Sequence, residues 1–134
     1  MFVKSREKLE ELCGALSTGN SWAKESSLIV AVYSEKNYDC VLNEREYYLF
    51  DTGMAVALLV LRATELSLVA HPIAGYEPEK VRNALGIPKE AVIITLIIVG
   101  KHSEKAVANL SSRQRLAELN RPSRKGFEEI ARIL

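Results

Sequence analysis

The most constraining feature of this sequence is the run Met54–Leu61, in which all eight residues are apolar. The run lies within a longer segment, from Asn43 to about Leu68, whose N-cap asparagine and acidic first turn predict a helix. A helix that is apolar on every side has to be surrounded by other apolar surface. A chain of 134 residues offers few places to surround so long a helix. We therefore expect a homodimer in which two subunits bury this helix between them.

A second apolar run, Ala91–Val99, predicts a central β-strand. It is rich in β-branched residues and shows no alternation of apolar and polar positions, which is typical of a strand with helices packed on both faces. Ser27–Tyr33 has the same character and predicts another buried strand. Phe2 and Val3 look like the tail of a further strand whose beginning would precede Met1.

Helical patterns surround these strands. Val69–Gly75, which contains a proline and ends in a glycine, is expected to be strand-like or irregular. The order of elements predicts an α+β fold, with helices on both faces of a sheet, as a single domain over residues 1–134. We expect helices from Ser5 to about Gly19, from Pro78 to Gly86, over Ser111–Leu119 and over Gly126–Leu134.

The balance of charge argues against several classes of partner. Eighteen lysine and arginine residues face seventeen aspartate and glutamate residues, for a formal net charge of +1. We therefore expect no general attraction to nucleic acid or to an anionic membrane. No apolar run approaches the roughly 20 residues of a membrane span, and the charged amino terminus lacks the apolar region of a secretory signal. These features predict a cytoplasmic protein.

The cysteines and histidines predict neither a disulfide framework nor a metal site. Cys13 and Cys40 lie far apart in the sequence without C-x-x-C spacing, so we expect ordinary thiols in a reducing compartment. His71 and His102 have no cysteine, aspartate or glutamate at ligand spacing, and no metal is expected.

Several segments resemble, in the same order, the nitroreductase family of homodimeric flavoproteins, which hold FMN at the subunit interface. The most diagnostic is HPIAGYEPEKVRNALGIPKEAVIITLIIVGK (71–101), with a Pro-Ile-x-Gly-aromatic turn, a short helix ending in Leu-Gly-Ile-Pro and a final core strand. The resemblance implies a three-layer α/β/α sandwich with a mostly antiparallel sheet. The other matching segments are FVKSREKLEEL (2–12), NSWAKESSLIVAVYS (20–34), YYLFDTGMAVALLVLRATELSL (47–68) and SRKGFEEIARIL (123–134).

The resemblance also implies a function and a site. It points to an FMN-dependent oxidoreductase that passes hydride from NAD(P)H to a nitroaromatic, quinone or similar acceptor. Because the flavin carries this chemistry, no catalytic residue is expected from the protein. The backbone of Ala74 and Gly75 would face the isoalloxazine ring. Arg124 would pair with the FMN phosphate, and Arg121 and Lys125 flank it and could share that role.

The residues alone leave other interpretations open. Pro72 and Gly75 would serve equally well as turn formers before a helix. The segment Arg121–Lys125 would serve as a solvated basic cluster. Aromatic side chains at the start of the long helix, such as Tyr47 and Phe50, could stack on a flavin or belong to a core or an interface.

The sequence departs from the family pattern at its amino-terminal end. Family members normally begin with an Arg-Arg-Ser-type segment that holds the FMN phosphate, followed by a Pro-Ser-x-x-Asn-x-Gln-Pro-Trp segment that contacts the flavin, and neither occurs here. Met1 is therefore interpreted as an internal start or as the start of a natural short form. Two alternative functions are a non-catalytic dimeric remnant with a reduced or absent flavin site, and an adaptor that binds an acidic partner through Arg121–Lys125.

Overall fold

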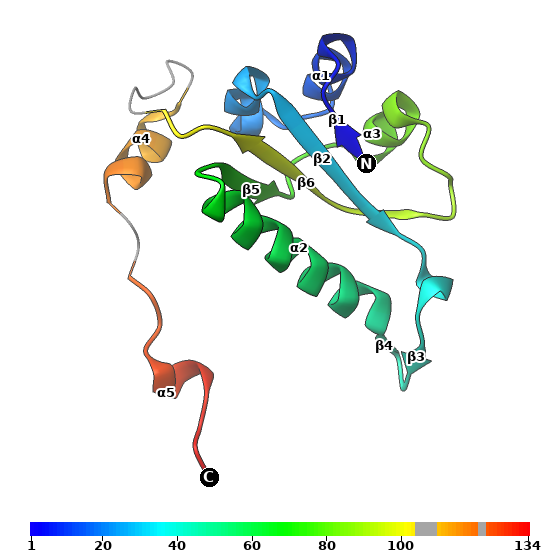
Figure 1. Cartoon of the computed structure of the whole chain (residues 1–134), viewed down its shortest axis with the longest axis vertical. Coiled ribbons are helices and arrows are strands. Elements are labelled where there is room, and N and C mark those ends of the chain that lie inside the picture. Colours follow the sequence, from blue (N-terminus) through cyan, green and yellow to red (C-terminus); the bar gives the residue numbers. More distant parts are fainter. Residues whose placement is uncertain (104–109, 121–122) are drawn as a thin grey trace. The chain divides into compact units, whose positions relative to one another are not determined.

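The chain divides into two compact units, Met1–Ser103 and Glu104–Leu134. The structure is a computed structural model that describes residues 1–103, 110–120 and 123–134, drawn in Figure 1. The first unit holds a four-stranded sheet with its helices, and two short helices follow in the second. The single domain expected over residues 1–134 stays a prediction.

The first unit is built on an antiparallel sheet with the strand order β1-β2-β6-β5. The predicted central strand, β6, pairs with β2 on one side and with β5 on the other (Figure 1). The segment expected to be strand-like or irregular contributes β5. The strands are β1 (Phe2–Val3), β2 (Leu28–Ser34), β5 (Val69–Ile73) and β6 (Val92–Gly100).

Helices cover both faces of this sheet. Alternate side chains of β6 divide between two cores: Leu96 and Ile98 belong to one, and Ile97 and Val99 to the other. Both cores are apolar, which confirms the predicted three-layer α/β/α sandwich. The first core is covered by α1 (Arg6–Cys13), the 3-10 helix η1 (Thr18–Glu25) and α3 (Pro78–Leu85), and the second by α2 (Tyr47–Glu65).

A β-bulge in β6 adjusts which side chains enter the first core. Val32 of β2 lies opposite Thr95, whereas the next residue, Tyr33, lies opposite Ile93. Ile94 is therefore an extra residue without a partner in this register. The insertion puts Ile93 and Leu96, three positions apart, into the same core, which strict alternation along a strand would not allow.

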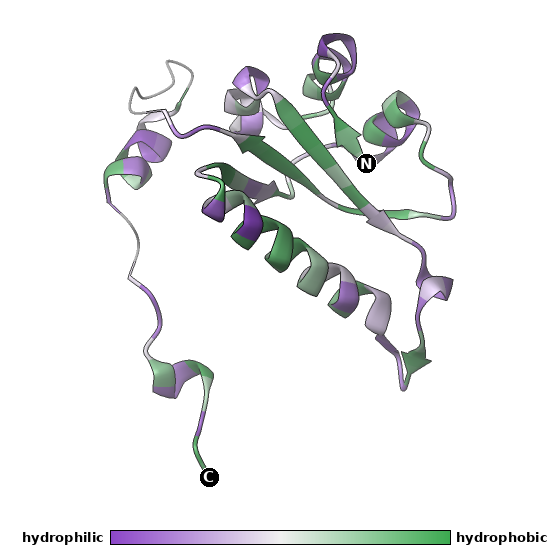
Figure 2. Ribbon diagram, in the orientation of Figure 1, coloured by the Kyte–Doolittle hydropathy of each residue, from purple (hydrophilic) through white to green (hydrophobic). Residues whose placement is uncertain are grey.

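Helix α2 packs on the sheet with one face and leaves an apolar face exposed. Its inner side chains Val56 and Leu59 contact the second core. Figure 2 shows apolar residues along much of the helix. Within the chain the predicted burial on every side is therefore not reached. The outer side chains are large and exposed, at Phe50 (61%), Met54 (49%), Leu58 (67%) and Leu61 (61%).

The predicted start of this helix at Asn43 is wrong. Asn43 and Glu44 have φ angles of 50° and 66° and form the turn of a small hairpin, β3 (Val41–Leu42) and β4 (Arg45–Glu46). Two consecutive positive φ angles suit a two-residue hairpin turn, and asparagine tolerates this conformation better than most residues. The helix therefore begins at Tyr47.

The first and last predicted helices are shorter than expected. Helix α1 ends at Cys13 instead of near Gly19, because the backbone N–H of Ser17 donates to the carbonyl of Gly75 (2.9 Å) and draws the chain away. In the second unit, α4 (Ser112–Leu119) has a capping box between Ser111 and Gln114. Helix α5 covers only Phe127–Ile130. Among the described residues, no helix is both long and apolar enough to cross a membrane.

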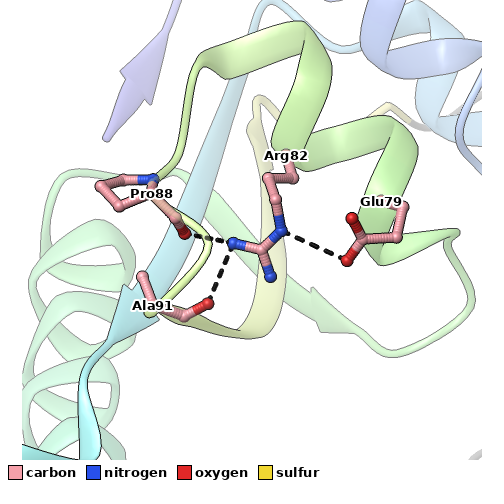
Figure 3. Close-up of polar contacts among 4 residues, drawn as sticks. All are labelled: Glu79, Arg82, Pro88 and Ala91. Atoms are coloured by element: carbon pink, nitrogen blue, oxygen red, sulfur yellow. Dashed lines mark hydrogen bonds and ion pairs between the residues drawn. The ribbon is translucent and has the colours of Figure 1, made fainter.

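Arg82 of α3 holds the connection between α3 and β6 (Figure 3). Its Nη1 donates to the carbonyl oxygens of Pro88 and Ala91, the latter at 3.0 Å, and its Nε pairs with Glu79 at 3.2 Å. The helix ends at Leu85, and the cap residue Gly86 has a φ of 64°, in the left-handed region that favours glycine. The side chain of Arg82 is only 13% exposed, and its bond to the Ala91 carbonyl is partly shielded from water.

We predict that Arg82→Lys lowers the free energy of unfolding by about 1–3 kcal/mol, because a single ammonium cannot reproduce the planar fork that reaches both carbonyls and Glu79. Urea unfolding would measure the change. The matched control is Arg62→Lys, in an exposed pair with Glu65, which should change stability by less than about 0.5 kcal/mol. Equal effects at the two positions would show that Arg82 is not a structural clamp.

Candidate functional site

The predicted flavin-contacting turn lies between β5 and α3. It is attached to the segment that joins α1 to η1. The carbonyl oxygen of Gly75 accepts hydrogen bonds from the backbone N–H of Ser17 (2.9 Å) and from Nδ2 of Asn20 (2.9 Å). The N–H of Glu77 donates to the carbonyl of Ala15 at 2.8 Å. These bonds hold the turn in place from the side of the helical layer.

Gly75 has a structural reason to be glycine. A Cβ at this position would lie 2.4 Å from Oγ of Ser17 and 2.6 Å from Nδ2 of Asn20. The absent side chain therefore allows η1 to approach the turn closely. This contact supports the turn-forming interpretation of Gly75. Ala74 is exposed and Gly75 is half-buried, so the backbone of the turn also remains accessible to a ligand, and the flavin contact stays a prediction.

Aromatic side chains flank the turn. Trp22 of η1 and His71 of β5 make an edge contact, with ring centroids 5.3 Å apart and an interplanar angle of 80°. The hydroxyl of Tyr76 donates to the carbonyl of Ile93 at 3.2 Å, and burial raises the pKa of this phenol. Sequence reasoning missed Asn20 and Ser17, whose role depends on a contact between residues more than fifty positions apart.

The predicted phosphate-binding residues belong to the second unit. Arg124 and Lys125 precede α5 and are exposed. Arg121 lies outside the described residues. Of the five predicted site residues, the structure brings together Ala74 and Gly75, which are neighbours in the turn. The role of Arg124 and Lys125 in binding a phosphate stays a prediction.

The aromatic residues at the amino-terminal end of α2 have divided roles. Tyr48 is buried, and burial raises the pKa of its phenol, so it belongs to the core. Tyr47 and Phe50 make an edge contact with centroids 6.3 Å apart, and the guanidinium of Arg45 lies 5.7 Å from the centre of the Tyr47 ring. Phe50 is exposed and remains available for an interface or a ligand.

Two carboxyl groups interact beside these aromatics. The backbone N–H of Cys40 donates to Asp39 (2.6 Å) and lowers the pKa of that carboxyl. A hydrogen bond to Asp39 raises the pKa of Asp51 on α2. Asp51 is exposed, so water can solvate its carboxylate and no partner is needed to compensate for burial. Among the described residues, no group of three or more histidine, cysteine, aspartate or glutamate side chains is placed to hold a metal ion.

We predict that Gly75→Ala destabilises the protein by about 1–3 kcal/mol, because the added methyl group would force Ser17 and Asn20 away from the turn. Thermal unfolding of the unchanged protein and of the variant would measure this change. Gly19→Ala, where a Cβ meets nothing within 4 Å, is the matched control and should be nearly neutral. A tolerated Gly75→Ala would mean that the turn does not need this close approach.

Comparisons with known proteins agree with this fold. A Mycolicibacterium smegmatis protein, the uncharacterized 15.4 kDa protein in the ask 5' region, is 32% identical over 116 residues, which cover 81% of this chain and 76% of that protein. A solved oxidoreductase containing FMN is 27% identical, with a TM-score of 0.77, and the match covers 98% of this chain and 68% of that one.

A second solved structure, a nitroreductase family protein from Clostridium novyi NT, has a TM-score of 0.70 and 24% identity. The match covers 77% of this chain and 60% of the Clostridium novyi chain, so this sequence spans about three fifths of that protein's length. The model of the nitroreductase family matches residues 4–101, from the end of β1 to just beyond β6. The chain belongs to the nitroreductase family.

Proposed function

We propose that this protein is an FMN-dependent oxidoreductase that transfers hydride from NAD(P)H to a nitroaromatic, quinone or similar acceptor. The observation that carries the proposal is the family match over residues 4–101, which includes the whole turn from β5 to α3. The similarity to a solved oxidoreductase that contains FMN supports the same cofactor. The flavin, when bound, supplies the hydride chemistry.

The residues of this chain would bind and orient the cofactor. Ala74 and Gly75 offer an accessible backbone at a turn that is anchored by Ser17 and Asn20. Such an anchored turn can support a flat ring without moving. Arg124 is exposed, and among the described residues no carboxylate lies within ion-pair distance of it. Its guanidinium is therefore available to bind the two oxygens of a phosphate.

The proposal includes a homodimer formed through the outer face of α2. Phe50, Met54, Leu58 and Leu61 are spaced four, four and three residues apart, so they form one apolar stripe along the helix. A continuous exposed stripe of large apolar side chains is typical of an interface. A second copy of the same helix is the occupant that we propose, because a twofold axis brings identical stripes together.

A second candidate function is a non-catalytic dimer that keeps the fold without a flavin. The observation in its favour is that contacts with Ser17 and Asn20 explain Gly75 completely, without any ligand at the turn. The two candidates differ in one property, which is whether the purified protein binds FMN.

We expect a titration with FMN to show saturable binding and a change in the flavin absorption bands. Arg124→Gln should raise the dissociation constant for FMN by about tenfold or more, because a charge-assisted bond to the phosphate is lost. Arg132→Gln, a matched change at another exposed arginine near the carboxyl terminus, should have little effect. Absence of FMN binding by the unchanged protein would favour the non-catalytic dimer, and equal affinities of both variants would remove Arg124 from the site.

We further expect Leu58→Asp to convert the dimer to a monomer that is still folded, because the interface would have to bury an unpaired carboxylate. The dimer dissociation constant should rise by at least about a hundredfold, as measured by sedimentation equilibrium. Leu116→Asp on α4, at a leucine of similar exposure (62% against 67%), is the control. A Leu58→Asp protein that remains dimeric would contradict the assigned interface.

A further inference from the structure

A cavity of about 620 Å³ lies between α1 and the segment that leads from η1 into β2. Figure 1 shows α1 and the 3-10 helix η1 next to each other on the same face of the sheet. None of the residues that line the cavity belongs to the turn at Gly75. The volume is in the range of small-molecule sites, about 300–1,000 Å³. The lining residues that matter here are Lys4, Arg6, Glu10, Cys13, Lys24 and Ser26.

The charge of the lining is unbalanced. Three cationic side chains face one carboxylate, Glu10, which pairs with Arg6 at 3.1 Å on the exposed surface. Within the part of the chain that the structure describes, neither Lys4 nor Lys24 has a carboxylate within 4.0 Å. Two ammonium groups around one cavity repel each other, and an anion between them removes that repulsion.

Ser26 adds an unsatisfied hydrogen-bonding group. Its Oγ is buried, and it has no hydrogen-bond partner among the described residues. Buried hydroxyl groups nearly always have a partner, so an exception calls for an explanation. A serine hydroxyl can turn about a single side-chain bond, and Ser26 itself lines the cavity. A ligand with acceptor oxygens would provide the missing partner.

Cys13 does not cancel the positive charge of the cavity. Burial raises the pKa of its thiol, and so does the charge of Glu10, while the charge of Lys24 acts in the opposite direction. The thiol is therefore neutral at neutral pH. It also provides a chemical reporter inside the cavity, because a bound ligand would restrict access to its sulfur.

We propose that this cavity binds a small molecule through a phosphate group, with Lys4 and Lys24 as the principal cationic contacts and the Ser26 hydroxyl as a donor. A phosphate monoester fits better than a carboxylate because its charge of nearly −2 at neutral pH matches two unpaired ammonium groups. Its three terminal oxygens also accept several hydrogen bonds at once. None of the residues that line this cavity is among those proposed to bind FMN.

Thermal unfolding in inorganic phosphate, compared with sodium chloride at equal ionic strength, tests the proposal. Phosphate should raise the melting temperature in a saturable way, since a ligand of the folded state stabilises it. Lys24→Gln and Lys4→Gln should each raise the apparent dissociation constant for phosphate by about tenfold. Lys89→Gln, at an exposed lysine outside the cavity, should leave it unchanged.

Ser26→Ala should affect the stability of the free protein and its stabilisation by phosphate in opposite directions. Without phosphate the variant should be as stable as the original protein or more so, because it removes a buried hydroxyl that lacks a partner. With phosphate its gain in melting temperature should be smaller. A purely structural serine would lower the melting temperature equally in both solutions, and that outcome would remove Ser26 from the site.

Alkylation of Cys13 tests occupancy without a change in the cavity. In a Cys40→Ser background, which removes the exposed thiol, phosphate at ten times its dissociation constant should slow alkylation by a neutral reagent about elevenfold. Chloride at equal ionic strength should not slow it. The proposal is overturned if phosphate neither stabilises the protein nor protects Cys13, or if Arg124→Gln abolishes both effects while Lys24→Gln and Lys4→Gln do not.

Discussion

The burial of β6 on both faces is the constraint on which the rest of the structure depends. Its alternate side chains enter two separate cores, so a helical layer is required on each side of the sheet. Because β5 pairs with β6, the turn that follows β5 comes close to η1, where the Gly75 carbonyl accepts bonds from Ser17 and Asn20. The position of the candidate flavin-contacting turn thus follows from the way in which β6 is covered.

Helix α2 has two apolar faces, and the sheet buries only one of them. Val56 and Leu59 face the second core, whereas Phe50, Met54, Leu58 and Leu61 are exposed. A solvent-exposed stripe of this length is unfavourable for an isolated chain. The proposed dimer removes the stripe from water and places the exposed aromatic residue Phe50 at a subunit boundary.

Elements with strong local signals could be predicted from the sequence. The strand near Ala91–Val99 and the helix from Pro78 to Gly86 are examples, because proline, glycine and β-branched residues mark them. The hairpin turn at Asn43 and Glu44 was not predicted, because an asparagine followed by acidic residues also fits the first turn of a helix. The carbonyl clamp of Arg82 and the contact of Gly75 with Asn20 depend on tertiary packing. For the candidate site, the sequence identified the turn but not the residues that anchor it.

In the proposed homodimer the outer face of α2 is covered. The chain has two methionines, and in the single chain they are almost equally exposed, Met1 at 45% and Met54 at 49%. Their oxidation by hydrogen peroxide, followed by peptide mass spectrometry, therefore has an internal reference. The account predicts that Met54 is oxidised much more slowly than Met1 in the native protein and at the same rate in denaturant. Equal rates in the native protein would show an uncovered helix and contradict the account.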